Sequence, residues 1–119
     1  MEFNQNTPIY LQIAEALGEK ILSGEWQEEA RIPSVRELGV QLGVNPNTIV
    51  RVYDCLEKNG TIFNRRGIGF FVAPNAKEMI VKRHKEAFIK EAAPAIIRKM
   101  KLLGISKEEF LEIMENVKE

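Results

Sequence analysis

Four arginines and a short run of polar residues within residues 33–72 have side chains suited to binding a polyanion. They are Arg36, Asn47, Thr48, Arg51, Arg65 and Arg66. Arginine donates paired hydrogen bonds to phosphate oxygens or to the edge of guanine, and Asn and Thr bind phosphates or base edges. This set of side chains favours recognition of a nucleic acid. No Ser/His/Asp, Cys/His or paired-carboxylate arrangement, and no glycine-rich phosphate loop, indicates catalysis.

Two short helices joined by a tight turn are predicted to position the first of these side chains. Ser34, with Glu37 three residues later, forms a capping box that begins one helix, and Gly43 makes the turn that ends it. Asn45-Pro46 begins the next helix as its cap and first residue. This order predicts a helix-turn-helix, in which the second helix enters the major groove of DNA and the first crosses the backbone.

The second of these helices is predicted to be amphipathic. Its buried face follows helical spacing through Ile49, Val52, Tyr53 and Leu56. Asn47, Thr48 and Arg51 then lie on or near the opposite surface, where a base edge or a phosphate would be. An alternative interpretation of Arg51 is that it is a solvated surface charge, paired with Glu37 or Asp54, and does not contact DNA.

A β-hairpin is predicted next, with strands at residues 61–64 and 69–72. Arg65 and Arg66 lie at its tip, and Gly67 permits the positive φ that such a turn needs. Two adjacent arginines at a hairpin tip have little structural use. After a helix-turn-helix they predict a wing that contacts DNA.

An amphipathic helix is predicted before this motif. Thr7 would cap it with Pro8 at its first position, and Gly24 would end it. Its apolar positions are Ile9, Ile13, Ala16, Leu17 and Ile21. Tyr10 and Trp26 are interpreted as packing residues, because neither falls in the motif.

Residues 75–119 are predicted to form a helical tail. Helical spacing runs from Ala76 to Leu103 with a kink or break before Pro94, and Ser106 with Glu109 caps a last amphipathic helix that extends to Val117. The tail is too short for a ligand-binding domain with its own core, and its apolar faces exceed what a lone arm can bury. We therefore expect a homodimer. The expected contact residues are Ile80, Phe88, Ile96, Met100, Leu103, Phe110 and Met114.

The fold class expected is mainly α, with residues 1–74 as a winged helix-turn-helix and residues 75–119 as a two-helix dimerisation tail. The 119-residue chain has no net charge. Residues 1–74 hold seven Lys and Arg against nine Asp and Glu, a net charge of −2, and residues 75–119 hold ten against eight, a net charge of +2. DNA-binding domains usually carry an excess of basic residues, and this chain does not. An alternative to DNA binding therefore stays open, in which the arginines of the winged helix contact an acidic protein partner.

Other features of the sequence favour a cytoplasmic protein. No apolar run approaches the roughly 20 residues that span a membrane, and the N-terminus does not resemble a signal peptide. The one cysteine, Cys55, is expected to be a small core residue, and the one histidine, His84, lacks partners for a metal site. We expect no cofactor, and no motif identifies a small-molecule effector.

Three stretches of the chain closely resemble the GntR-type winged-helix regulators. They are PIYLQIAEALGEKILSGEW, IPSVRELGVQLGVNPNTIVRVYDCLEKNG and RRGIGFFV. The Asn-Pro-Asn-Thr run at 45–48, followed by a short two-helix tail, is similar to the YtrA subfamily. The resemblance implies a bacterial transcription regulator, usually a repressor, that binds inverted repeats of double-stranded DNA as a homodimer. YtrA-like members often belong to operons with ABC transporter genes.

The resemblance also implies which residues contact DNA. By motif match they are Arg36, Asn47, Thr48, Arg51, Arg65, Arg66 and Gly67. The chain departs from the family at Pro46 and Val50, where arginines are frequent, at Gly39, where alanine is more usual, and at Phe70, where a small or hydroxyl residue is common. From the length of 119 residues we expect the chain not to belong to the aminotransferase-fused branch of the family.

Overall fold

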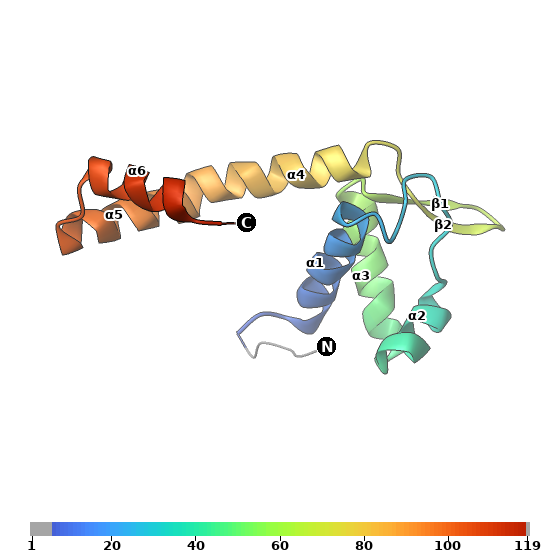
Figure 1. The fold of residues 1–119 in the computed structure, drawn as a ribbon. Helices are drawn as coiled ribbons and strands as arrows, with labels where there is room; N and C mark the ends of the chain where they lie inside the picture. Colours follow the sequence, from blue (N-terminus) through green and yellow to red (C-terminus); the bar gives the residue numbers. More distant parts are fainter. Residues whose placement is uncertain (1–5, 119) are drawn as a thin grey trace. The chain divides into compact units, whose positions relative to one another are not determined.

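The computed structural model describes residues 6–118, which form two compact units that divide between Lys82 and Arg83 (Figure 1). The first unit holds α1 (Ile9–Leu22), α2 (Val35–Leu42), α3 (Pro46–Lys58), β1 (Ile62–Arg65) and β2 (Gly69–Val72). The helix α4 (Ala76–Ala87) crosses the division. The second unit continues through a π-helical turn (Phe88–Ala92), α5 (Ala93–Leu103) and α6 (Lys107–Asn116). The predicted fold class, mainly α with one hairpin, is confirmed.

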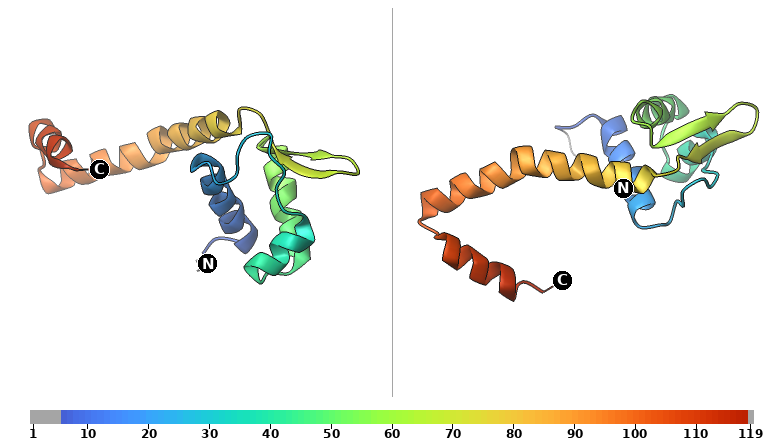
Figure 2. Two further views of the ribbon diagram at one scale, coloured as in Figure 1. Left: turned by 45° about the vertical axis from the view of Figure 1, so that its right-hand side comes forward. Right: turned by 90° about the horizontal axis from the view of Figure 1, so that it is seen from above.

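The core of the first unit is built around α3, on which both α1 and α2 pack. The predicted buried face of α3 is confirmed, because Ile49, Val52, Tyr53 and Leu56 are all buried. The rest of the core comes from each neighbouring element, with Ile13, Leu17 and Ile21 from α1, Leu38 from α2, and Ile62 and Val72 from the hairpin. The two views of Figure 2 show the hairpin projecting beyond the helices that it follows.

A third, short segment of the chain pairs with the hairpin. β1 and β2 pair antiparallel with Arg65 opposite Gly69. On the other side of β2, the Ile32 N–H donates to the Phe70 carbonyl oxygen at 2.9 Å and the Val72 N–H donates to the Ala30 carbonyl oxygen at 3.0 Å. These hydrogen bonds hold residues 30–32, which precede α2, against the wing.

The start of β1 differs by one residue from the prediction. Thr61 precedes the strand, and its buried hydroxyl donates to the Leu56 carbonyl oxygen at 3.0 Å. This bond satisfies a carbonyl group at the end of α3. Thr61 lies between the helix and the strand, because its N–H also donates to the Leu56 carbonyl oxygen while its own carbonyl oxygen accepts from the Ala73 N–H. At the other end of the strand, Arg65 belongs to β1 rather than to the loop, because it pairs with Gly69.

The start of α1 also differs from the prediction. Pro8, not Thr7, occupies the cap position, with an extended ψ of 140°, and no side chain caps the helix. The carbonyl oxygen of Pro8 accepts from the N–H groups of Leu11 and Gln12, whereas that of Thr7 accepts from the Gln12 side chain at 2.7 Å. The extended backbone at Pro8 delays the first helical residue to Ile9.

The other predicted helix signals are confirmed. Both capping boxes form, Ser34 with Glu37 and Ser106 with Glu109. Gly43 and Gly104 end their helices with φ of 66° and 70°, the left-handed region that glycine tolerates. Val117, however, lies at the cap of α6 and not within it.

The irregularity predicted before Pro94 is a π-helical turn, Phe88–Ala92. Proline has no N–H to donate, and its ring crowds the carbonyl group four residues earlier, here that of Lys90. A wider turn accommodates both effects without ending the helix.

Ile80, which was expected on the dimerisation surface, lies instead in the core of the first unit. Ala76 and Ile80 are buried in the core of the first unit, with Ile80 only 2% exposed. The side chain of Ile80 is thus occupied within this unit, and the core extends beyond residue 74.

Candidate nucleic-acid interface

The turn between α2 and α3 fixes the polar first turn of α3. The Asn47 N–H donates to Asn45 Oδ1 at 2.8 Å, and the Thr48 N–H donates to the Asn45 carbonyl oxygen at 2.9 Å. The Asn47 side chain is exposed and Thr48 is half-buried. Since the opposite face of α3 is in the core, the first two turns of the helix present Asn47, Val50 and Arg51 to the outside.

Arg51 has a partner that the sequence did not predict. Its guanidinium carbon lies 4.2 Å from the centroid of the Tyr10 ring, a cation–π contact between α3 and α1. Neither of the acids proposed as partners pairs with it, since Asp54 is bonded to Lys58 Nζ at 2.9 Å and Glu37 caps α2. Tyr10 does pack against the core, as expected, and in addition supports Arg51.

A polar hollow of about 380 Å³ surrounds this contact. It is lined by Tyr10, Arg51, Asp54, Cys55, Lys58 and Asn59. Lys58 Nζ donates a hydrogen bond to the Asp54 carboxylate, which raises the pKa of Lys58. The hollow carries two cations, Arg51 and Lys58, against one carboxylate.

Tyr53 holds α3 in place relative to the wing and to the start of α2. Its hydroxyl donates to the Pro33 carbonyl oxygen at 2.5 Å, and its ring meets that of Phe70 edge-on with centroids 4.8 Å apart. Burial raises the pKa of this hydroxyl well above its ordinary value, which keeps it a donor. Phe70, which stands where the family commonly has a small or hydroxyl residue, thus supplies a ring that packs the wing against α3.

The two wing arginines have different surroundings. The guanidinium carbon of Arg65 lies 5.0 Å from the centroid of Phe71 and 5.8 Å from that of Phe63, and these two rings stack. Arg66 and Gly67 form the tip, where Gly67 has a φ of 78° and the Ile68 N–H donates to the Arg65 carbonyl oxygen at 2.9 Å. Arg65 therefore lies along the hairpin, and Arg66 is at its end.

Sequence reasoning missed Arg31. Its backbone bridges Phe71, and a Cβ at Gly69 would lie 3.1 Å from Arg31 Nε, so its side chain runs along the wing. The sequence carried no signal for this, because strand pairing across 40 positions cannot be read from local pattern. Three arginines therefore lie along the wing: Arg65 and Arg66 in the hairpin, and Arg31 from the segment before α2.

Arg36 is exposed in the first turn of α2. Among the residues that the structure describes, Arg36, Arg51, Arg65 and Arg66 form no ion pair. Their charges are therefore not neutralised by a bonded carboxylate.

Within residues 6–118, no cluster of His, Cys, Asp and Glu could hold a metal ion. None of the described helices is both long and apolar enough to cross a membrane.

A helix-turn-helix with a polar, solvent-facing first turn, followed by an arginine-bearing hairpin, defines a DNA-binding winged-helix regulator. Comparison with known proteins agrees. The family described as "Bacterial regulatory proteins, gntR family" matches residues 9–72, and the chain belongs to this family.

Two relatives from Bacillus subtilis match nearly the whole chain. The HTH-type transcriptional regulator YhcF is 40% identical over 93% of this chain and 90% of its own length. The HTH-type transcriptional repressor YtrA is 35% identical over 94% of this chain and 85% of its own length. The similar proteins are transcriptional regulators, so the chain is a regulator and not an enzyme.

Solved structures extend the comparison. A GntR family transcriptional regulator from Listeria monocytogenes is 31% identical, with a TM-score of 0.74 over 98% of this chain and 100% of its own. The DNA-binding domain of AraR, solved in complex with operator ORR3, is 33% identical, with a TM-score of 0.54 over 61% of this chain and 86% of its own.

Proposed function

We propose that this protein is a cytoplasmic repressor that binds an inverted-repeat operator as a homodimer. Residues 1–74 would supply the DNA-binding surface and residues 75–119 the dimerisation tail, with the first turns of α4 completing the DNA-binding core. The observation that carries the proposal is that α3, which presents the polar first turn, and the arginine-bearing wing are held together. Tyr53 of α3 donates to the Pro33 carbonyl oxygen, and its ring packs against Phe70 of the wing.

Different roles are proposed for the seven DNA-contacting residues. Asn47, Thr48 and Arg51, at the start of α3, would read base edges or bind adjacent phosphates. Arg36, from the helix that crosses the backbone, would bind phosphate. Arg65, Arg66 and Gly67 would form the wing contact, in which Gly67 lets the backbone turn at the tip.

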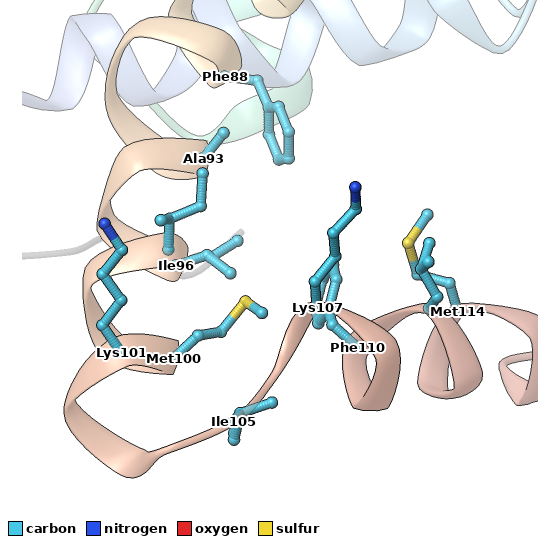
Figure 3. Close-up of a pocket in the computed structure, with 11 residues that line it drawn as sticks. Phe88, Ala93, Ile96, Met100, Lys101, Ile105, Lys107, Phe110 and Met114 are labelled. Atoms are coloured by element: carbon cyan, nitrogen blue, oxygen red, sulfur yellow. The ribbon is translucent and has the colours of Figure 1, made fainter.

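The tail supports the dimer proposal through an apolar groove between α5 and α6 (Figure 3). The groove has a volume of about 630 Å³ and is lined by five of the seven expected contact residues, Phe88, Ile96, Met100, Phe110 and Met114. Phe88 and Met114 are 54% and 59% exposed. Leu103 is 63% exposed outside the groove lining. Apolar surface of this extent favours association with a second copy.

Repression and the gene target rest on resemblance. Several relatives are named repressors, YtrA among them. By the resemblance, YtrA-like proteins often belong to operons with ABC transporter genes. We infer that this chain controls such an operon. A transporter operon next to its gene, and derepression of that operon when the gene is deleted, would support the inference.

The experiment that tests the function is selection of duplexes by the protein from a randomised library, followed by measurement of affinity against salt. We expect an enriched inverted repeat, a complex of two chains per site, and affinity that falls as salt rises. Retention on neither duplex DNA nor heparin at low salt would contradict the proposal. It would favour the protein-partner alternative, which the net charge of −2 in residues 1–74 keeps available.

A further inference from the structure

We propose that Tyr10 is a positioning residue for Arg51, which it holds with the donor edge of the guanidinium free to bind DNA. The inference rests on the proposed function and adds a residue outside the helix-turn-helix to the determinants of affinity. It starts from the 4.2 Å separation between the Arg51 guanidinium carbon and the centroid of the Tyr10 ring.

The geometry of a stacked arginine explains why this contact suits recognition. The guanidinium is planar, and its five N–H donors all lie in that plane. Under this proposal the Tyr10 ring, over which the guanidinium carbon lies, meets one face of that plane and restrains the side chain without using its donors. An ion pair would restrain Arg51 equally well but would occupy those donors.

The neighbouring charges leave the donors available. Asp54 lines the same hollow, but its carboxylate is bonded to Lys58 Nζ at 2.9 Å. No ion pair of Arg51 occurs within residues 6–118. In this arrangement the one acid in the hollow is bonded to Lys58 and not to Arg51.

The position of Tyr10 gives the ring a fixed orientation. Tyr10 lies in the first turn of α1, is half-buried and packs against the core, and α1 packs on α3. A side chain anchored in this way loses little further freedom when DNA binds. Arg51 is then already ordered, so less conformational entropy is lost on binding.

The test is a double-mutant cycle measured as affinity for a duplex selected by the wild-type protein. The variants are Tyr10→Leu, Arg51→Ala, the two combined, and Tyr10→Phe as the matched control that keeps the ring. Tyr10→Leu is expected to weaken binding by about 2- to 5-fold for each bound protomer, the range of an exposed cation–π contact. Tyr10→Phe should bind within about 2-fold of the wild type.

The decisive result is the effect of Tyr10→Leu when Arg51 is already alanine. If Tyr10 acts through Arg51, the leucine substitution should then change affinity by less than about 1.5-fold, because nothing remains to be positioned. Repeating the selection with Tyr10→Leu should relax base preference at the same position as Arg51→Ala does.

Three outcomes would overturn the inference. One is an equal loss from Tyr10→Leu in the presence and absence of Arg51, which would assign Tyr10 a purely structural role. Another is tighter binding by Tyr10→Leu, which would mean that the ring sequesters Arg51. The third is a Tyr10→Phe variant that binds as weakly as Tyr10→Leu. Failure of the wild-type chain to bind any duplex is a different result and would count against the proposed function itself.

Discussion

Glu28 caps the start of α4 by accepting a hydrogen bond from the backbone N–H of Lys77 at 3.3 Å. Its second carboxylate oxygen accepts from the N–H of Asn75, also at 3.3 Å and 47 residues further along the chain. A helix begins with N–H groups that lack partners and carry partial positive charge, so a carboxylate stabilises them. Glu28, whose negative charge would repel DNA, thus has a structural role at the start of α4.

Replacing Glu28 with glutamine should destabilise the protein by about 1 kcal/mol, because an amide cannot accept both bonds and carries no charge. The matched control is Glu29→Gln, which makes the same change of charge at the next residue. Urea unfolding of both variants at one protein concentration measures the difference. Equal midpoints for the two variants would show that Glu28 does not cap α4.

Gly39→Ala should destabilise the chain although alanine is the better helix former. A Cβ at Gly39 would lie 2.9 Å from the backbone oxygen of Val44, which cannot move without disturbing the turn before α3. At Gly18, inside α1, a Cβ would meet nothing within 4 Å. Gly18→Ala should therefore stabilise by about 0.5–1 kcal/mol. Thermal unfolding of both variants checks the pair, and a stabilising Gly39→Ala would contradict the close approach.

Lowering the pH should reduce the contribution of the capping box at the start of α2 to the stability of the protein. The backbone N–H and the hydroxyl of Ser34 bond the Glu37 carboxylate and lower its pKa below the ordinary value of 4.5, and the charge of Arg31 adds to this. The unfolded chain then takes up the proton first as the pH falls, so stability is lost below about pH 4.5.

The measurement for this prediction is urea unfolding of wild type and Glu37→Gln from pH 7 downward. Glutamine can still accept from the Ser34 N–H but does not titrate. The stability of the wild type should therefore fall toward, or below, that of the variant as Glu37 protonates. Parallel stability profiles for the two proteins would refute the role assigned to Glu37.

The wing should contribute to the salt dependence of DNA binding. Arg65 and Arg66 are two of seven cations in residues 1–74. The double change Arg65→Ala, Arg66→Ala should flatten the slope of log affinity against log salt by roughly 2–4 units, since each lost phosphate contact accounts for about 0.9 and a dimer loses each twice. Affinity at low salt should also fall, while the fold is kept.

The control for the wing is Arg98→Ala, Lys99→Ala, which removes two exposed cations from α5. This variant should keep the wild-type slope. A wing variant with unchanged affinity and slope would show that the wing does not engage DNA, and would favour the protein-partner alternative.

The tail groove should be needed for dimerisation. Ile96 lines the groove, whereas Leu102, 87% exposed, does not. Ile96→Lys would place a charge in the proposed interface and should give monomers at micromolar concentration, and Leu102→Lys should stay dimeric. Sedimentation velocity distinguishes the two. A monomeric wild type under the same conditions would rule out the proposed homodimer.

The sequence by itself determined the local structure that carries the DNA-binding motif. The capping box of Ser34 and Glu37, the left-handed turn at Gly43 and the buried face of α3 were all predicted and are all present. Each depends on residues within a few positions of one another, because helix caps and helical periodicity are set by nearby backbone groups. The π-helical turn before Pro94 follows from the same kind of local constraint.

Only the tertiary structure decided which side chains from distant segments meet. Three contacts each join residues that lie 38 or more positions apart. They are the cation–π contact of Arg51 with Tyr10, the position of Arg31 beside Gly69 and the capping of α4 by Glu28. The burial of Ile80 in the first unit belongs with these contacts. Amphipathic spacing shows that a face must be covered but not what covers it, since many apolar or charged partners satisfy the same local pattern. The packing of α1, α3, α4 and the wing around one core selected these partners.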